Sequence, residues 1–188
     1  MIYMKGRALR GLFISSAIRG LGCDMNGLPY LHLELTMHEE PRQPAWPADV
    51  SIAGFSHEYA RATHDLLVRA YAGGGGSVAG FDNWYNGLIT DSEYDPELAV
   101  LVLDQAHRSV AFVQRWNSAF IKDLVVDPGR RREGLGEALL VHVLRLFFHR
   151  GQTTVSLKAE RDNSSGAEKI YKRLGFSEVP AAKLHTKA

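Results

Sequence analysis

The chain has 188 residues, of which 45% are hydrophobic and 23% are charged, and its formal net charge is +1. A chain of this length can bury about 70% of the surface that its unfolded form exposes, so it needs neither a disulfide nor a metal to hold a core. The small net charge excludes a general nucleic-acid or membrane-binding surface, and any affinity for phosphate must therefore be local.

The N-terminal residues predict no membrane anchor. The apolar run over residues 11–18 is too short to span a bilayer, and Arg19 interrupts it. The single cysteine, Cys23, cannot form an internal disulfide, which favours a cytoplasmic protein.

Residues 30–37 alternate between polar and apolar side chains, as a strand does, and the prolines that follow indicate a stiff linker.

Residues 50–126 predict four strands and two helices. We expect strands over residues 50–55, 98–103, 110–116 and 119–126, and helices over residues 57–71 and 81–89. The apolar face of the first helix is predicted to contain Tyr59, Ala62, Leu66, Leu67 and Ala70. Gly73 to Gly76 follow a helix and have no strand before them, so they predict a flexible loop and not a phosphate-binding turn.

After residue 126 the pattern alternates between helix and strand. Apolar residues recur at helical spacing from Leu135 to Phe147, and Gly151 lies where a C-terminal cap belongs. We expect a strand over residues 153–159, a helix over 164–174 and a strand over 176–179. Antiparallel strands followed by this alternation predict an α/β (α+β) protein with a mixed sheet and helices on both faces.

The segment from Ile121 to Leu140 predicts a buried strand, a glycine-bearing turn and an amphipathic helix. The first N–H groups of a helix have no partners within it and carry a partial positive charge, so they can bind a phosphate. Gly134 and Gly136 let the backbone approach such a ligand, and the three arginines at 130–132 add cations. An ordinary turn with solvated arginines is the alternative interpretation of these residues alone.

Two other phosphate sites do not fit this segment. A Walker loop needs Gly-Lys-Ser/Thr at the start of the helix, and Gly134-Leu-Gly-Glu-Ala138 contains neither the lysine nor the hydroxyl residue. The dinucleotide fingerprint GxGxxG needs a third glycine, but that position is Leu139. Nucleotide hydrolysis and Rossmann-type binding are therefore disfavoured.

The remaining pattern, Arg131-x-x-Gly134-x-Gly136, resembles the pyrophosphate-binding motif Gln/Arg-x-x-Gly-x-Gly/Ala of the GCN5-related N-acetyltransferase (GNAT) superfamily. Asp123 to Pro128 resembles the fourth strand of that family and its exit. Asn163 to Phe176 is similar to the family pattern Asn-x-x-(x)-Ala-x-x-x-Tyr-x-x-x-Gly-Phe. The resemblance covers roughly residues 98–179.

The resemblance implies a mixed, mostly antiparallel sheet flanked by helices, whose fourth and fifth strands splay apart to admit acetyl-CoA as a cosubstrate, without a metal. The residues implied in cofactor binding are Leu124, Val125, Val126, Arg131, Arg132, Glu133, Gly134, Leu135, Gly136 and Asn163. Backbone groups of the three strand residues would pair with the peptide-like pantetheine arm. Asn163 would contact the same arm, although it also fits a turn or a helix cap.

The resemblance also implies a catalytic residue, Tyr171. It corresponds to the family's tyrosine beside the CoA sulfur, where a phenolic hydroxyl could protonate the departing thiolate. On the predicted helix Tyr171 shares an apolar face with Ala167, Ile170 and Leu174, so a core tyrosine is the alternative.

The acceptor amine must lose a proton, and here the sequence departs from some relatives. Members that act on protein N-termini can carry a glutamate five positions before the asparagine, where this chain has Lys158. Asp123, Glu160 and His142 are candidate bases. We assign none of them, because many relatives use water or no dedicated base.

The acceptor is expected to bind mainly to residues before 98. An acidic loop would attract a cationic amine such as a polyamine, an aminoglycoside or lysine, or it is simply solvated. Its carboxylates are those of Asp82, Asp91, Glu93, Asp95 and Glu97. Three aromatic residues fit an acceptor pocket and core packing equally well. They are Trp84, Tyr85 and Trp116.

Members of the family usually begin near the strand predicted at Val50, so we interpret residues 1–49 as an N-terminal extension and residues 50–188 as the acetyltransferase domain. Residues 180–188 are short and polar where relatives have a last strand. We therefore expect residues 30–37 to fill an edge position of the sheet, in this chain or in the partner of a homodimer. The extension also resembles the end of a preceding domain in tandem acetyltransferases.

The expected function is transfer of the acetyl group of acetyl-CoA to a primary amine of a small molecule or a protein, by direct attack in a ternary complex. The alternative is a non-catalytic acyl-CoA-binding sensor or regulatory domain of the same fold. The small net charge opposes a third interpretation, a nucleic-acid-binding module.

Overall fold

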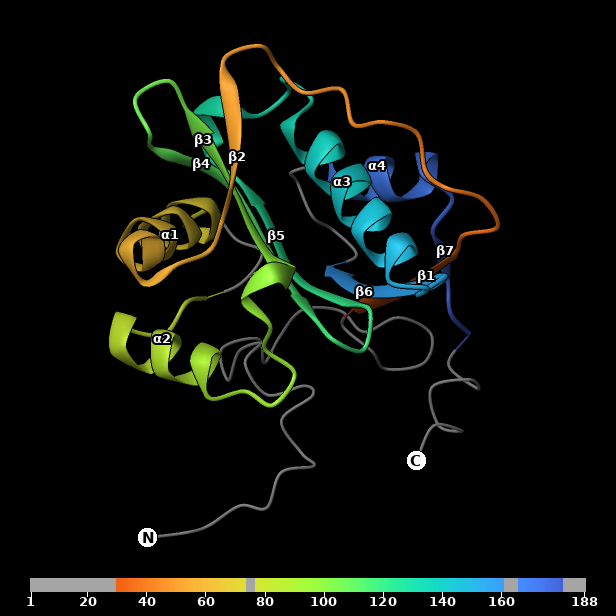
Figure 1. Cartoon of the computed structure of the whole chain (residues 1–188), viewed down its shortest axis with the longest axis horizontal. Helices are drawn as coiled ribbons and strands as arrows, with labels where there is room; N and C mark the ends of the chain where they lie inside the picture. The colour runs from red at the N-terminus through yellow and green to blue at the C-terminus, as the bar shows by residue number, and fades with distance from the viewer. Residues whose placement is uncertain (1–29, 74–76, 161–165, 181–188) are drawn as a thin grey trace, which may run out of the picture.

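The computed structural model describes residues 30–73, 77–160 and 166–180, and has one mixed sheet between two layers of helices (Figure 1). The strands are β1 (Tyr30–Thr36), β2 (Val50–Gly54), β3 (Ala99–Asp104), β4 (Ser109–Trp116), β5 (Phe120–Val126), β6 (Thr154–Glu160) and β7 (Ser177–Glu178). The helices are α1 (His57–Tyr71), α2 (Phe81–Ile89), α3 (Leu135–His149) and α4 (Ala167–Arg173), with short 3-10 turns η2 (Pro96–Leu98) and η3 (Pro128–Arg130). The predictions for Cys23, Asn163 and Gly74 to Gly76 concern residues outside the described ranges.

The order of the strands in the described sheet is β2-β3-β4-β5-β6-β1-β7, and β5 and β6 are its parallel pair. This confirms the predicted fold class, a mixed and mostly antiparallel sheet with helices on both faces. Within the ranges that the structure describes, no helix is long and apolar enough to cross a bilayer.

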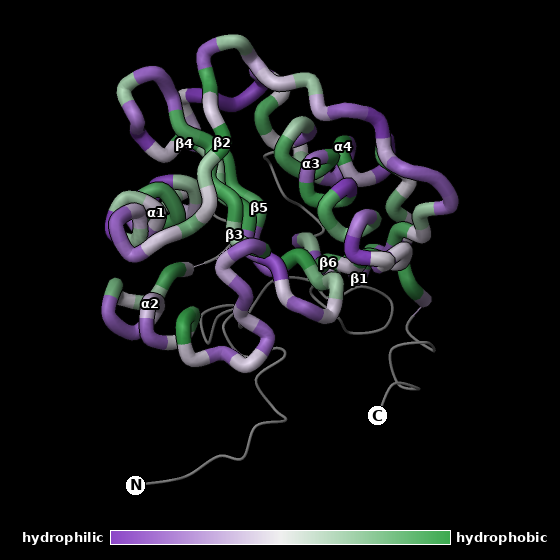
Figure 2. Tube along the Cα trace, viewed as in Figure 1, coloured by the Kyte–Doolittle hydropathy of each residue, from purple (hydrophilic) through white to green (hydrophobic). Residues whose placement is uncertain are grey.

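The centre of the sheet is buried on both faces. Every residue of β3 is buried, and so is every residue of β4 except Trp116, which explains why these strands have continuous apolar runs. α1 and α2 cover one face and α3 and α4 the other, with the apolar segments of the central strands between them (Figure 2). The core on the α1 side includes Leu66, Leu101 and Phe112, and the core on the α3 side includes Leu139, Phe147 and Val155.

The predicted helices over residues 57–71 and 81–89 are confirmed as α1 and α2. The assignment of Ala62 to the buried face of α1 is wrong, because that face runs through Ala60, Thr63 and Leu67 and leaves Ala62 exposed. The last strand is shorter than predicted: β7 has two residues, and Phe176 packs in the core instead.

β1 lies in this chain's own sheet, between β6 and β7. Its seven residues pair with β6 in antiparallel register, from Tyr30 opposite Glu160 to Thr36 opposite Thr154. On its other side, Leu33 pairs with a residue of β7. The strand therefore lies one place in from the edge position that we expected, because the short β7 adds to its outer side.

Residues 38–49, here called the strap, run from β1 along α3 to β2 (Figure 1). The carboxylate of Glu40 forms an ion pair with Arg145 and lies 2.6 Å from Nε2 of His149. Such exposed pairs contribute little individually. The apolar residues that β1 buries beneath α3 must therefore supply most of the energy that holds it in the sheet.

Replacement of one of these buried residues tests the position of β1. Leu33 is 4% exposed, whereas Ile52 on the edge strand β2 is 43% exposed. We expect Leu33→Ala to lower the free energy of unfolding by about 2–5 kcal/mol, because it leaves a cavity. Ile52→Ala should lower it by about 0.5 kcal/mol. Urea denaturation measures both values, and equal losses in the two variants would show that β1 is not a fixed part of the sheet.

Candidate functional site

The candidate site is a gap between β5 and β6. These parallel strands pair at two positions, Phe120 with Ser156 and Ile121 with Leu157. Beyond them β5 continues to Val126 and β6 continues to Glu160 without further pairing. Peptide groups along the two facing edges are therefore left without a neighbouring strand, a position in which an extended ligand can be bound.

Hydrogen bonding to β4 determines which peptide groups of β5 face the gap. The N–H group of Asp127 donates to the carbonyl of Val110 at 2.8 Å, so the peptide groups of Asp127 point toward β4. Because these groups alternate along a strand, those of Val125 also point toward β4 and those of Leu124 and Val126 point into the gap. Of the three strand residues predicted from the sequence, Leu124 and Val126 thus direct their peptide groups into the gap, and Val125 does not.

A β-bulge aims Asp123 at α1. Arg115 pairs with Ile121 and Gln114 pairs with Asp123, so Lys122 is an extra residue on β5. In a regular strand without a bulge, Asp123 would share the face of Ile121, which lies toward α3. With the bulge, Asp123 faces α1, where the hydroxyl of Tyr71 donates a hydrogen bond of 2.7 Å to its Oδ1 atom.

Tyr71, the last residue of α1, was not among the predicted site residues. Burial raises the pKa of Tyr71 well above its usual value, the charge of Asp123 and the hydrogen bond to it raise the pKa further, and Tyr171 and Glu160 add smaller contributions. The hydrogen bond between Tyr71 and Asp123 therefore joins α1 to β5 beside the gap. The sequence gives only a weak indication of a site role for Tyr71, because a tyrosine at the end of an amphipathic helix is typical of core packing.

Tyr171 belongs to the opposite face of the sheet. It is 8% exposed in the core beneath α3, and the edge of its ring meets Phe176 with 5.9 Å between the ring centroids. Burial raises the pKa of Tyr171 to about 12. Its hydroxyl therefore keeps its proton at neutral pH, as a hydrogen-bond donor must.

The glycine-bearing turn leads directly into α3. Gly134 has a φ of +84°, which a residue with a Cβ adopts only under strain. No side chain caps α3, so the N–H groups of its first turn point out of the end of the helix. A Cβ on Gly136 would lie 3.5 Å from Val126 Cγ2 and 3.7 Å from Ile170 Cδ1, so this turn packs closely against β5 and α4. The N-terminal end of α3 thus adjoins the gap.

The three arginines beside this turn differ in their partners. Arg130 donates to Glu133 at 2.6 Å and to Asp49 at 2.8 Å, so its charge is already neutralised. Arg131 donates to the carbonyl of Ala70 at 3.1 Å, near the C-terminal end of α1. Arg132 is exposed and has no ion-pair partner among the residues that the structure describes. The free donors of Arg131 and the whole guanidinium group of Arg132 can therefore bind an anion.

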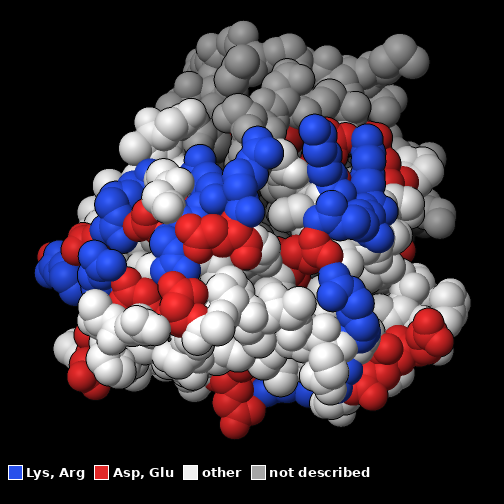
Figure 3. All heavy atoms as spheres, turned by 90° about the horizontal axis from the view of Figure 1, so that it is seen from above, with Lys and Arg blue, Asp and Glu red and all other residues white. Residues whose placement is uncertain are grey.

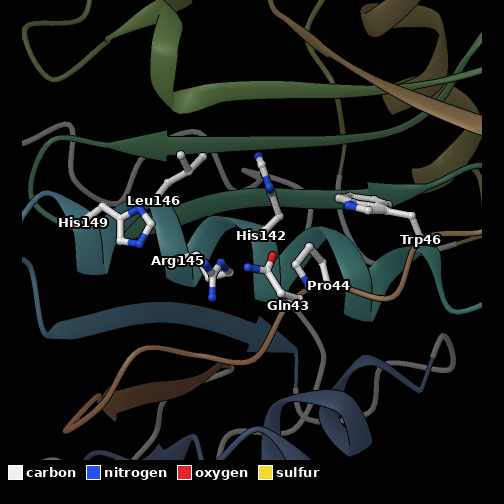
Figure 4. Close-up of a pocket in the computed structure, with 7 residues that line it drawn as sticks. All are labelled: Gln43, Pro44, Trp46, His142, Arg145, Leu146 and His149. Carbon is white, nitrogen blue, oxygen red and sulfur yellow. The ribbon is translucent and has the colours of Figure 1, made fainter.

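The candidate base His142 lies away from the gap. It lines a pocket of about 340 Å³ between the strap and α3, with Gln43, Pro44, Trp46, Arg145, Leu146 and His149 (Figure 4). Its ring meets the ring of Trp46 edge to face at 5.9 Å, and burial lowers its pKa. Of the three candidate bases, Asp123 and Glu160 lie at the gap and His142 lies under the strap.

The acidic loop has structural partners. The carboxylates of Asp95 and Glu97 accept hydrogen bonds from Arg150 at 2.9 and 2.7 Å. Asp91 accepts the backbone N–H of Glu93 at 2.8 Å. Figure 3 shows one face of the molecule, on part of which basic and acidic side chains lie next to one another. Much of the charge of this loop thus serves to fix its own conformation.

The three aromatic candidates have different surroundings. Trp84 is buried in the core on the α1 side, in contact with Phe55 and Phe81. Tyr85 is half-buried and stacks on Phe81 with 5.8 Å between the ring centroids. Trp116 is half-buried, with the Lys122 Nζ atom 5.5 Å from its ring. Core packing accounts for Trp84, while Trp116 lies beside the bulge that aims Asp123.

Sequence comparison identifies relatives of this chain. A sequence model of the Acetyltransferase (GNAT) family matches residues 35–176. The mycothiol acetyltransferase of Clavibacter sepedonicus is 30% identical over 138 residues, which are 71% of this chain and 44% of that protein. The ribosomal protein bS18 alanine N-acetyltransferase of Escherichia coli is 37% identical over 63 residues, which are 34% of this chain and 42% of that protein. The chain spans less than half the length of these curated relatives in the matched regions.

Solved structures share the fold. A GCN5-related N-acetyltransferase from Sphaerobacter thermophilus superimposes with a TM-score of 0.69 at 24% identity, over 80% of this chain and 48% of that chain. The ribosomal-protein-S18-alanine N-acetyltransferase from Escherichia coli superimposes with a TM-score of 0.57 at 23% identity, over 70% and 79% of the two chains. At these identities the likeness describes the fold alone.

The raised pKa of Tyr171 predicts a loss of stability at alkaline pH. The folded state keeps a proton up to a pKa of about 12, whereas the unfolded chain releases it near about 10. The free energy of unfolding must therefore fall as the pH rises from about 10 toward about 12. We expect Tyr171→Phe to remove about 1 kcal/mol of this fall at about pH 11. Denaturation of both proteins at about pH 8 and about pH 11 checks this, and parallel pH profiles would contradict it.

Proposed function

Because the chain belongs to the Acetyltransferase (GNAT) family and is thus an acyltransferase, we propose that it transfers the acetyl group of acetyl-CoA to a primary amine of a small molecule or a protein. The attack would be direct, within a ternary complex. One observation carries this proposal: the gap between β5 and β6 has Tyr171 on one face, the Tyr71–Asp123 pair on the other and the glycine-bearing turn beside it.

The residues at the gap fit the donor. The N–H groups at the start of α3, in Leu135 and Gly136, are suited to the pyrophosphate, together with Arg131 and Arg132. The peptide groups of Leu124 and Val126 that face the gap are suited to the amides of the pantetheine arm. Gly134 supplies the left-handed turn that brings these two parts together.

The side chains on the two faces then have separate tasks. Bound acetyl-CoA supplies the thioester that the amine attacks. Tyr171, kept protonated by burial, holds the proton that the departing sulfur requires. On the other face, the carboxylate of Asp123 can accept a proton from the amine directly or through the hydroxyl of Tyr71.

Binding of the donor is tested by two matched glycine variants. Gly134 and Gly151 both have positive φ, +84° and +75°, and a Cβ at either position would meet open space. Gly134→Asp and Gly151→Asp should therefore lose similar stability, but only the first introduces a carboxylate at the proposed pyrophosphate site. In the native protein and in Gly151→Asp, acetyl-CoA at 100 times its dissociation constant should add about 2.7 kcal/mol, which raises the melting temperature by roughly 5–10 °C.

The melting temperature of Gly134→Asp should not respond to acetyl-CoA. An equal rise in both variants would refute the assignment of the pyrophosphate site. No rise in the native protein would refute acetyl-CoA as the donor.

Turnover of an amine panel tests the role of Tyr171. We expect Tyr171→Phe to lower kcat by about 100-fold, because the departing thiolate loses its proton source, while the response of the melting temperature to acetyl-CoA is retained. Tyr59→Phe, on the half-buried flank of α1, is the matched control and should keep full activity. Release of free thiol measures the rate. Unchanged kcat in Tyr171→Phe would leave Tyr171 a core residue only.

A further inference from the structure

The face of β6 that turns away from α3 carries Lys158 and Glu160. The odd-numbered residues from Val155 to Ala159 belong to the core beneath α3. Because side chains alternate along a strand, Lys158 and Glu160 lie on the face toward α1, as Asp123 does. These charged groups thus border the gap on the side that is opposite to Tyr171.

Lys158 has no counterion among the described residues. It is half-buried and forms no hydrogen bond or ion pair within the part of the chain that the structure describes, and burial lowers its pKa. Lys122, across the gap on the bulge of β5, has a partner, because its Nζ atom lies 3.2 Å from Asp123 Oδ2. A partly desolvated cation is costly to keep without an anion. Lys122 is therefore paired with a carboxylate, whereas Lys158 is not paired with one among the described residues.

Glu160 lies on the same face, two residues farther along β6, which is about 6.6 Å in a strand. Its carboxylate also forms no ion pair within the described residues. Tyr30 lies opposite it on β1, and burial and then the charge of Glu160 raise the pKa of Tyr30. Lys158 and Glu160 thus lie on one face without an ion pair within the described residues, an arrangement suited to a ligand that carries both charges.

The donor does not supply the missing anion. Its pyrophosphate is assigned to the start of α3, and α3 covers the opposite face of the sheet from Lys158. The described carboxylates of this face, Asp123 and Glu160, form no ion pair with Lys158, so we assign the anion that pairs with Lys158 to the acceptor.

We propose that the acceptor is a small amine that also carries a carboxylate, such as an amino acid, and that Lys158 determines this specificity by binding the carboxylate. Glu160 and the Tyr71–Asp123 pair then receive the ammonium group. The inference rests on the proposed function and narrows its acceptor. In the reaction the nitrogen forms an amide bond to the acetyl carbon and the carbon–sulfur bond breaks. The ammonium group loses two protons, one of which ends on the sulfur of CoA and the other in solvent.

The test compares amino acids with their C-terminal amides, which keep the amine and the shape but lose the negative charge. The native protein, Lys158→Met, Lys158→Arg and the exposed-lysine control Lys172→Met are assayed by release of free thiol from acetyl-CoA. The same proteins are also assayed with a polyamine, an aminoglycoside and a lysine-containing peptide.

In the native protein and in Lys172→Met, kcat/KM should be about tenfold or more higher for the best amino acid than for its amide, because a charge-assisted contact is lost in the amide. Lys158→Met should lose this preference, because the KM of the amino acid rises. Lys158→Arg should keep most of it. The KM of acetyl-CoA should be the same in all four proteins.

Other outcomes separate the two proposals. Turnover of amines with no preference for the carboxylate, or a preference that persists in Lys158→Met, would overturn the inference and leave the proposed function standing. A change in the KM of acetyl-CoA alone would assign Lys158 to the donor and would also overturn it. No turnover of any amine by a protein whose melting temperature responds to acetyl-CoA would overturn both.

Discussion

The early end of pairing between β5 and β6 is the constraint on which the rest of the structure depends. After two residue pairs the strands separate, although both lie in the middle of the sheet. Unpaired peptide groups in such a position are normally costly, and proteins keep them where something else can bond to them. Tyr171 belongs to the core on one face of the sheet and Tyr71 lies on the other face, so the proposed function uses groups from both faces.

The chain supports this opening from both sides. On the α3 side, Gly136 packs against Val126 and Ile170, so the first turn of α3 holds the outer part of β5 in place. On the α1 side, the hydrogen bond from Tyr71 to Asp123 joins α1 to the same strand. Arg131 adds a further link, because it donates to a carbonyl near the end of α1. The site and the framework of the fold thus use the same contacts.

Much of the fold followed from periodicity, because α1, α2 and the apolar central strands have long and regular patterns. The turn at Gly134 and Gly136 was also predictable, since left-handed backbone and close approach need glycine. The bulge at Lys122 was not, because it depends on the register between β4 and β5, and register is a property of two strands. The face of Asp123, and with it the role of Tyr71, depends on that bulge. The position of β1 inside the sheet was likewise invisible, since a two-residue strand such as β7 has no sequence signature.

The place of β1 has a consequence for how the protein reaches its native state. The first described strand pairs with β6, near the other end of the described chain, and not with its neighbours in sequence. A ribosome must therefore release nearly the whole described region before β1 can pair with β6. The sheet is completed by contacts between residues that lie far apart in the sequence. Until then β6 presents a free edge to any other copy of Tyr30–Thr36 nearby. Exchange of this strand between two nascent chains would make the same contacts, so the route to a monomer and the route to a strand-swapped dimer diverge at this last step.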